Sequence, residues 1–401
     1  MTQQEKLLLP QGKVKKLILE HTARTKKRKD FSAHYFYFLH TIRTRPYIDR
    51  RFSSSEYIPI NYNILKGIIS ERQIRDIKRF LLRNNIIQCN NKYYKGEVSK
   101  SYKVNTAVTG KYWLYETITD KLLTKKLNMH RLDNHSQIRK KGKGYEIALY
   151  WLHEIEINYR KAYQYAHKFR AIDSEKYNAY SYSIKELKHR KYRSLIDDNK
   201  RMHHNLSNLA SVFRKHLHIS GERLGQIDIK NSQPLFLYLH SIDSKEVDRQ
   251  ELIKYGENCI KGQFYETLAS EQNTKLNTHN RKEYKQKVFA SIFFGKDYDV
   301  MSETEKAFNR LYPTIHEYMV KLKREQGYKV ISEILQKSEA DFIYKAITYI
   351  DKATGYHKVP LLAIHDCIVT TESNLESVTE LLKNYFVEQY VILPRLSTEA
   401  Y

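Results

Sequence analysis

Two apolar runs on either side of a polar pair constrain the fold of this chain most strongly. Segment 360–370 reads PLLAIHDCIVT, so His365 and Asp366 interrupt a nearly continuous apolar stretch. Short apolar runs of this kind form buried strands, and the polar residues between them occupy the turn. The pattern predicts an antiparallel β-hairpin with His365 and Asp366 at its tight turn.

Two further segments, distant in the sequence, carry related residue types. Residues 224–229 read LGQIDI, which predicts a short strand with Asp228 at its end. Four residues recur at every fourth position of a predicted helix over 281–295: Arg281, Lys285, Phe289 and Phe293. This spacing places the four side chains along one slowly drifting helix face.

Two acids and a basic, aromatic helix face suit nucleotidyl transfer. Two carboxylates from distant positions can hold two Mg²⁺ ions about 3.5–4 Å apart. Mg²⁺ needs few carboxylates, because substrate and water complete its coordination. One ion activates an attacking hydroxyl and the other stabilises the pyrophosphate leaving group. Arg and Lys then meet the triphosphate, and Phe stacks on sugar and base. Each signal alone is weak, and their order and spacing together favour this chemistry.

The composition indicates a polyanionic partner. The 401 residues include 70 Lys and Arg against 45 Asp and Glu, a formal net charge of +25, and cations that neutralise phosphates release condensed counterions. No run of about 18 apolar residues marks a membrane span, so we expect no membrane partner. Three scattered cysteines, Cys89, Cys259 and Cys367, argue against a disulfide framework or a structural zinc site. They fit a reducing compartment and predict a cytoplasmic location.

Residues 57–104 have the layout of a basic helix followed by a hairpin. Ser70 and Gln73 form a predicted capping box at the start of the helix. Two short strands are expected at 86–89 and 92–94, with an Asn-Asn turn between them. The layout resembles a winged helix that binds duplex DNA, and the alternative is a small helical module for protein contacts.

Residues 145–195 show a helical, strongly charged pattern with apolar stripes. One interpretation is a connector that packs on the next domain. The other is a thumb-like pair of helices that grips a duplex backbone.

The three segments with Asp228, Lys285 and Asp366 resemble motifs A, B and C of family A DNA polymerases, the group of bacterial DNA polymerase I. The family's Arg-x3-Lys-x3-Phe-x3-Tyr motif corresponds to the four residues that recur in 281–295, with Phe at the last position. Its His-Asp-Glu motif corresponds to His365, Asp366 and Cys367.

Three more elements match the family in the same order. Segment 311–319 looks like its Tyr-Pro-x4-Tyr-Met helix, and segment 336–343 looks like its Gln-Gly-Thr-Ala-Ala-Asp-Ile-Ile segment. Arg201 with Asn208 and Leu209 matches the element that touches the primer. The resemblance spans about residues 200–375 and implies a polymerase.

The resemblance also implies a role for each matching residue. Asp228 and Asp366 would bind two Mg²⁺ ions, for which Mn²⁺ is an expected substitute, with the Ile229 carbonyl as an extra ligand. Lys285 would contact the triphosphate and protonate the leaving pyrophosphate. The other implied nucleotide contacts are Arg281, Phe289 and Phe293. The implied primer or template contacts are Arg201, Gln336 and His365.

This sequence also departs from the family pattern. Residues 229–231 separate Asp228 from the Ser-Gln pair, which follows it after one residue in the family, so the strand end must bulge or turn differently. Leu235 replaces a Glu that helps to exclude ribonucleotides, and Cys367 replaces the Glu of the last motif. The chain has no room for an exonuclease domain beside its N-terminal module. It therefore resembles a minimal polymerase of phages and mobile elements.

The sequence thus predicts an α+β protein with the palm and fingers of a right-hand polymerase and an antiparallel palm sheet. Residues 1–110 would form the winged-helix-like module, 111–199 the helical connector or thumb, and 200–401 the palm and fingers, with the fingers at about 241–325. The expected activity is template-dependent DNA synthesis at a 3′-hydroxyl with release of pyrophosphate. The expected partners are a DNA primer-template, nucleoside triphosphates, and proteins of replication or of a mobile element.

Two alternatives stay open. The first is a DNA-binding replication initiator or regulator whose polymerase fold has lost catalysis, although the retained Asp228, Lys285 and Asp366 argue against a pure binder. The second is an RNA-synthesising or template-independent polymerase on the same fold. Leu235 leaves the choice between deoxynucleotides and ribonucleotides open.

Overall fold

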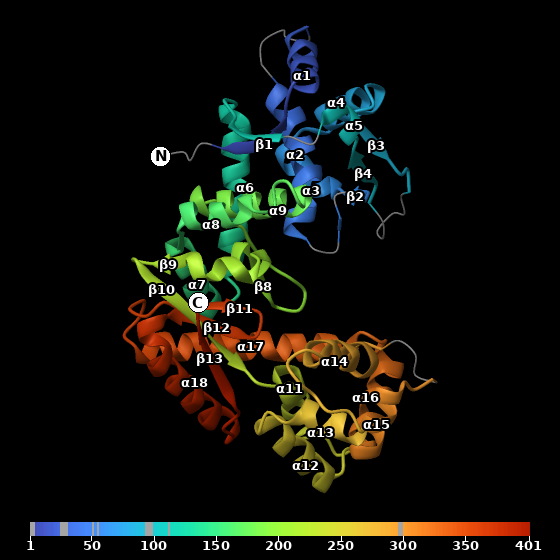
Figure 1. Cartoon of the computed structure of the whole chain (residues 1–401), viewed down its shortest axis with the longest axis vertical. Coiled ribbons are helices and arrows are strands. Elements are labelled where there is room, and N and C mark those ends of the chain that lie inside the picture. Colours follow the sequence, from blue (N-terminus) through green and yellow to red (C-terminus); the bar gives the residue numbers. More distant parts are fainter. Residues whose placement is uncertain are drawn as a thin grey trace. The chain divides into compact units, whose positions relative to one another are not determined.

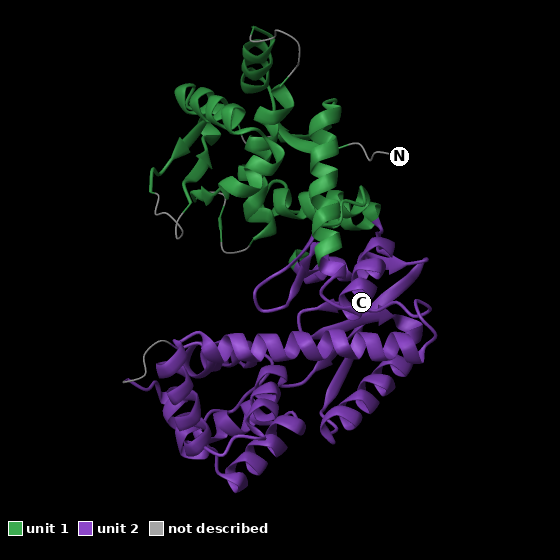
Figure 2. Ribbon diagram, turned by 180° about the vertical axis from the view of Figure 1, so that it is seen from behind, with its two compact units in different colours: residues 1–137, 159–193, 208–210 green, residues 138–158, 194–207, 211–401 purple. Residues whose placement is uncertain are grey.

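The antiparallel sheet expected in the C-terminal half is present. The structure, a computed structural model, describes residues 5–24, 31–49, 52–53, 56–92, 99–110, 113–295 and 300–401. In the described residues no helix is both long and apolar enough to cross a bilayer. The chain divides into two compact units (Figure 2). Unit 1 comprises residues 1–137, 159–193 and 208–210, and unit 2 comprises 138–158, 194–207 and 211–401. The sequence predicts a division into three functional parts, 1–110, 111–199 and 200–401, and this division stays a prediction.

Unit 2 is built on a six-stranded antiparallel sheet with the order β11-β12-β10-β9-β6, in which β13 also pairs with β10. Its strands are β6 (Glu156–Ile157), β9 (Leu217–Ile219), β10 (Glu222–Ile229), β11 (Leu362–Ile364), β12 (Cys367–Thr371) and β13 (Leu396–Ala400). The predicted strand at 224–229 is confirmed within β10. The predicted hairpin is confirmed as β11 and β12, and His365 in its turn has a φ of 56°.

Alternation along β10 separates a buried face from a functional face. Ile227 and Ile229 are buried, and Gly225, on the same face, approaches Leu375 at the start of α18 (Leu375–Tyr390) so closely that a Cβ would not fit. Asp228 points to the opposite face, because successive side chains of a strand alternate. The helix therefore covers one side of β10 and leaves the acid on the other side.

Helices complete unit 2. The long helix α17 (Val330–Ala353) packs against α7 (Lys143–Glu154), α18 and the hairpin strands (Figure 1). A helical segment separates β10 from α17. It contains α11 (Ser232–Ser241), α12 (Arg249–Ile260), α13 (Phe264–Glu271), α14 (Arg281–Val288), a π-helical turn η2 (Phe289–Phe293), α15 (Glu303–Leu311) and α16 (Pro313–Gln326). Two short strands, β7 (Ser194–Ile196) and β8 (Met202–His204), pair with each other, and the short elements α10 (Asn205–Asn208) and η1 (Ser211–His216) follow them.

Unit 1 contains two small sheets and a set of helices. Strands β1 (Lys6–Pro10) and β5 (Trp113–Thr117) pair, and β2 (Ile58–Pro59), β4 (Ser101–Val104) and β3 (Ile87–Cys89) form a second sheet in that order. Its helices are α1 (Lys13–Arg24), α2 (Ser32–Ile48), α3 (Tyr62–Ile68), α4 (Glu71–Arg83), α5 (Thr106–Thr109), most of α6 (Lys121–Arg139), α8 (Tyr159–His167) and α9 (Ser174–Lys188).

The expected capping box is present at the start of α4. The Ser70 side chain accepts a hydrogen bond from the Gln73 backbone N–H, and the Gln73 side chain accepts one from the Ser70 backbone N–H. The partner of β3 differs from the expectation. It is β4, whose first residue Ser101 lies eleven residues after Asn90, where the expected two-residue turn would begin. Residues 93–98, which include most of the expected strand 92–94, lie outside the described residues. Duplex binding by this module stays a prediction.

Gly144 tests the close packing of α7 on α17. A Cβ at this position would overlap the carbonyl oxygen of Tyr344, so we expect Gly144→Ala to lower the free energy of unfolding by about 2–3 kcal/mol through overpacking. Urea unfolding followed by circular dichroism measures this loss. Gly67→Ala in α3 is the matched control, since no atom lies within 4 Å of its Cβ. The alanine there should be neutral or slightly stabilising, and equal losses in both variants would contradict the packing argument.

Candidate active site

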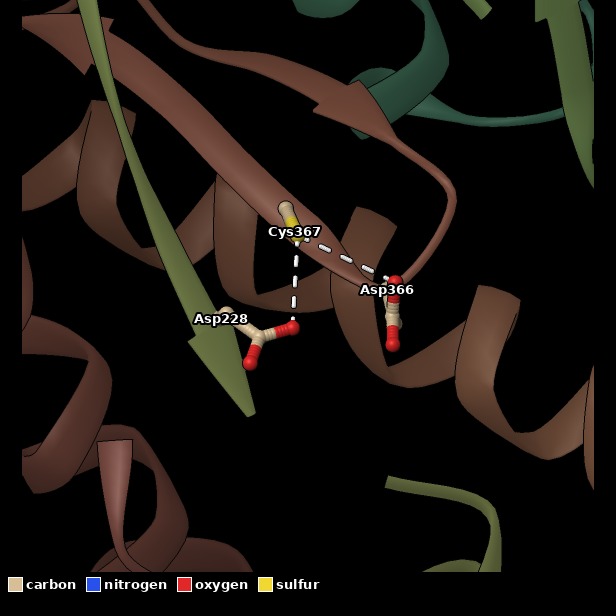
Figure 3. A group of neighbouring side chains, drawn as sticks. All are labelled: Asp228, Asp366 and Cys367. Carbon is tan, nitrogen blue, oxygen red and sulfur yellow. Dashed lines mark hydrogen bonds between the residues drawn. The ribbon is translucent and has the colours of Figure 1, made fainter. Parts of the chain in front are cut away.

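The pairing of β10 with β12 brings the two predicted acids together. Asp228 lies near the end of β10 and pairs in register with Cys367 at the start of β12. Asp366 precedes Cys367 in the hairpin turn. One ligand atom from each of these three residues lies within 4.8 Å of the others. The Cys367 thiol is 3.5 Å from Asp228 Oδ1 and 3.8 Å from Asp366 Oδ1, between the two carboxylates (Figure 3).

Asp366 lies in a desolvated position close to two other carboxylates. Its pKa is raised to about 7, first by desolvation and then by the carboxylates of Glu339 and Asp228, while the Arg201 guanidinium lowers it. Burial raises the pKa of the Cys367 thiol, so this group adds no charge. A cation among these groups would relieve the repulsion that disfavours ionised Asp366.

Asp228 is held by groups on both sides of its strand. Lys230 Nζ lies 3.1 Å from Asp228 Oδ2, and Ser397 Oγ in β13 donates to the same oxygen over 3.4 Å. Ile229, whose carbonyl was expected as a ligand, is the last residue of β10, with a buried side chain and Leu396 opposite it in β13.

The turn after β10 accounts for the three residues that distinguish this chain from the family pattern. β10 ends at Ile229, and Asn231 adopts the left-handed conformation with a φ of 55° immediately before α11. Asn tolerates this conformation better than most residues. The turn therefore starts a new helix at Ser232, and a difference from the family's turn stays a prediction.

The structure places Lys285 in electrostatic range of both acids. Desolvation lowers its pKa first and Arg281 lowers it further, whereas the charges of Asp228 and Asp366 raise it. Lys285 Nζ also lies 5.0 Å from the ring centroid of Tyr265. Arg281 is one turn away on α14, where it forms an ion pair with Glu266.

The two phenylalanines of the same pattern follow Lys285 along the helix. Phe289 lies with its ring centroid 6.4 Å from that of Tyr265, the ring that Lys285 also approaches. Phe293 follows in the π-helical turn η2, with its ring centroid 5.6 Å from that of Phe289. Phe293 is fully buried, with its ring centroid 6.3 Å from that of Phe264. Phe289 is partly buried and stacks on the exposed Phe294 at 5.5 Å. Of Phe289 and Phe293, only Phe289 has a side chain that a ligand can reach in this conformation.

The expected primer contacts lie near the hairpin turn. Gln336 accepts a hydrogen bond from Asn199 over 3.1 Å. His365 is exposed, yet its pKa is lowered to about 4 because its ring is partly desolvated and because nearby cations, first Arg201, oppose protonation. His365 is therefore neutral at pH 7 and within electrostatic range of Arg201.

Glu339 is a site residue that the sequence reasoning missed. Its side chain is 1% exposed, forms an ion pair with Arg201 and accepts a hydrogen bond from Ser232 Oγ. Segment 336–343 already contained a signal. Glu339 lies three residues before Phe342 and four before Ile343, so its helical spacing predicts the buried face. A charged residue on that face needs a partner, and Arg201 provides it.

Comparisons with known proteins give only a weak structural similarity. Among solved structures, the POL domain of Pol1 from M. smegmatis, in complex with DNA primer-template and dNTP, has a TM-score of 0.38 and 14% identity. The match covers 60% of this chain and 55% of that chain. No family model matches the chain, and no curated protein matches it either. The function proposed below therefore rests on the geometry of the site.

The pair of Arg201 and Glu339 predicts a strong coupling in stability. Arg201→Met leaves Glu339 charged and buried without its partner, so we expect the free energy of unfolding to fall by about 3 kcal/mol. The double variant Arg201→Met/Glu339→Gln should recover at least half of this loss, and a double-mutant cycle in urea measures the coupling.

Lys200 and Asp341 form the matched control for this cycle. Their side chains are 50% and 40% exposed, so Lys200→Met should cost less than about 1 kcal/mol. A loss for Arg201→Met as small as that for Lys200→Met would show that the buried pair does not stabilise unit 2.

Proposed function

We propose that this chain is a nucleotidyltransferase, and specifically a template-dependent DNA polymerase of the minimal family A type. The observation that carries the proposal is the convergence of Asp228 and Asp366 on one face of the sheet, in electrostatic range of Lys285. Three segments far apart in the sequence provide these groups. A purely structural sheet has no need for two close acids opposite a half-buried lysine.

The donor groups fit divalent ions. The carboxylates of Asp228 and Asp366 are hard oxygen ligands of the kind that Mg²⁺ prefers, and desolvation together with the neighbouring carboxylates of Glu339 and Asp228 raises the pKa of Asp366, an effect that a bound cation would oppose. When bound, such ions activate a hydroxyl and stabilise a leaving pyrophosphate. The Cys367 thiol is a softer ligand than a carboxylate, so it does not favour Mg²⁺ over Mn²⁺. It also contributes no negative charge to the site.

The residues of the site then take distinct roles. Lys285 binds the triphosphate and holds a proton that it delivers to the departing pyrophosphate. Its depressed pKa makes this transfer easier than from an ordinary lysine. Arg281 exchanges Glu266 for phosphate oxygens. Phe289 provides an apolar surface for the incoming nucleotide.

The primer end belongs on the side of the hairpin turn. His365 is neutral and exposed there, so its ring can accept or donate a hydrogen bond in the minor groove. Gln336 and Arg201 lie on the neighbouring segments. Arg201 contacts DNA only through guanidinium nitrogens that Glu339 leaves free, so Glu339 fixes the orientation of that contact. The net charge of +25 attracts the duplex from a distance.

Removal of either acid tests the proposal. We expect Asp228→Asn and Asp366→Asn to lower nucleotide incorporation by about 10³-fold, since each removes several kcal/mol of transition-state stabilisation. Primer extension with each dNTP and each NTP, with and without template, measures this loss. Asp243→Asn, which changes an exposed acid after α11, is the matched control and should retain full activity.

Filter binding in a salt series separates the proposal from the binding-protein alternative. Both acid variants should bind primer-template at least as well as the wild type, because they lose negative charge next to phosphate. Full incorporation in both variants would refute the proposed mechanism. Tight DNA binding without incorporation by the wild-type chain would favour a DNA-binding initiator.

Lys285 gives a second, independent test. We expect Lys285→Met to lower kcat for incorporation by about 10²-fold, the usual contribution of a positioned general acid, and Lys285→Arg to restore part of it. Lys282→Met, an exposed lysine in the same turn of α14, is the control for lost charge. Equal losses in Lys282→Met and Lys285→Met would indicate general attraction of DNA rather than a role in the reaction.

A further inference from the structure

Unit 1 contains a pocket that none of the preceding roles uses. It has a volume of about 260 Å³ and is lined by residues of β1, α2, β5, α8, α9 and the turn after α8. Pockets for drug-sized ligands begin at about 300 Å³. This pocket therefore suits a small ligand or a single unit of a longer polymer.

One wall of the pocket is aromatic. Tyr47, Trp113, Tyr115 and Tyr182 all line it. The ring centroid of Tyr182 is 5.8 Å from that of Tyr47 and 6.4 Å from that of Tyr115. Aromatic side chains of this kind stack on planar ligands, and base stacking tolerates any sequence because every base has a π-face.

The charged side chains of the lining are all cations. They are Arg43, Arg170 and Lys185, and no lining residue in the described part of the chain is an Asp or a Glu. Arg43 pairs with Glu175 through Nη2 at 3.3 Å, but desolvation lowers the pKa of Lys185 without any carboxylate to offset it. An anionic ligand would stabilise these groups, whereas a cationic ligand would be repelled.

Three buried polar atoms along the pocket have no hydrogen-bond partner within the described ranges: Arg43 Nε, Tyr47 Oη and Ser181 Oγ. Their side chains belong to residues that are 4%, 8% and 6% exposed. Folded proteins leave few such groups unpaired, because each costs about 1–3 kcal/mol. One guanidinium N–H and two hydroxyl groups beside a cationic pocket would find partners in a ligand rich in oxygen acceptors once these buried groups turn toward it.

We propose that this pocket binds one nucleotide, with the base against the aromatic wall and the phosphate against Arg170 and Lys185. A free nucleotide and the terminal nucleotide of a strand share this chemistry. The site lies wholly in unit 1 and does not depend on Asp228 or Asp366. It would bind nucleic acid or a nucleotide whether or not the chain synthesises DNA.

Fluorescence of Trp113 provides the test. The chain has two tryptophans, so Trp151→Phe in the full-length protein leaves Trp113 as the reporter in the pocket. We would add Asp228→Asn and EDTA, which remove metal-dependent nucleotide binding in unit 2. The probes are dAMP, TMP, thymidine, inorganic phosphate, and oligothymidylate with or without a 5′-phosphate. Equilibrium dialysis of the same probes gives the dissociation constants independently.

We expect the monophosphates or the 5′-phosphorylated strand to quench Trp113 and to bind at least about tenfold more tightly than thymidine or phosphate. Arg170→Ala and Lys185→Ala should each weaken binding about tenfold, a factor equal to 1.4 kcal/mol. Lys188→Ala is the matched control. It removes the same charge from α9, but Lys188 lies over the Tyr159 ring at 3.7 Å and does not line the pocket.

The outcomes separate clearly. Tighter binding of the phosphorylated strand than of the monophosphates would assign the site to a strand end, and equal binding would assign it to a nucleotide. Both results support the proposal. No binding of any probe would overturn it, as would phosphate binding as tight as nucleotide binding, or equal losses in Lys185→Ala and Lys188→Ala. Arg170 is exposed, so Arg170→Ala tests the site even if Lys185→Ala fails to fold.

Discussion

Antiparallel pairing between β10 and β12 is the interaction on which the candidate active site depends. The ladder sets Asp228 opposite Cys367 and so places Asp366 beside them. A slip of one residue would turn Asp228 toward the helix-covered face and Ile227 toward the site, because side chains alternate along a strand. Buried Ile227, Ile229 and Ile368 oppose such a slip, since exposing them would lose their hydrophobic burial. Apolar packing therefore fixes the positions of the polar groups.

Charged and polar side chains contact Asp228 or lie close to Asp366. Lys230 and Ser397 bind Asp228 from its own strand and from β13. Glu339 neutralises Arg201 and at the same time raises the pKa of Asp366, because its carboxylate lies behind the site. Glu339 thus orients Arg201 on the primer side, and its repulsion of Asp366 makes a bound cation at the site more favourable. Glu339 lies on the long helix α17, which packs against the hairpin strands β11 and β12.

Local patterns predicted the parts of the fold that local interactions determine. The hairpin at 365–366, the strand around Asp228 and the capping box at Ser70 depend on residues close in sequence, and all three are present. The four-residue spacing of 281–293 did not reveal the π-helical turn at Phe289–Phe293 or the burial of Phe293, because neither leaves a mark in the spacing. The strand partner of β3 was also misplaced, since pairing partners depend on loop length and tertiary packing. Glu339 was missed because its partner Arg201 lies in a distant segment.

Cys367 gives the candidate active site an unusual chemical character. Its sulfur lies between two carboxylates that oppose the formation of a thiolate, and burial acts in the same direction. Since only the thiolate reacts readily with peroxides and disulfides, this sulfur is protected from oxidation by the same acids that it contacts. Where a third carboxylate would add charge to a crowded site, the thiol fills the space as a neutral and unreactive neighbour. The site thereby keeps its acids close together without the electrostatic strain of one more ionised group.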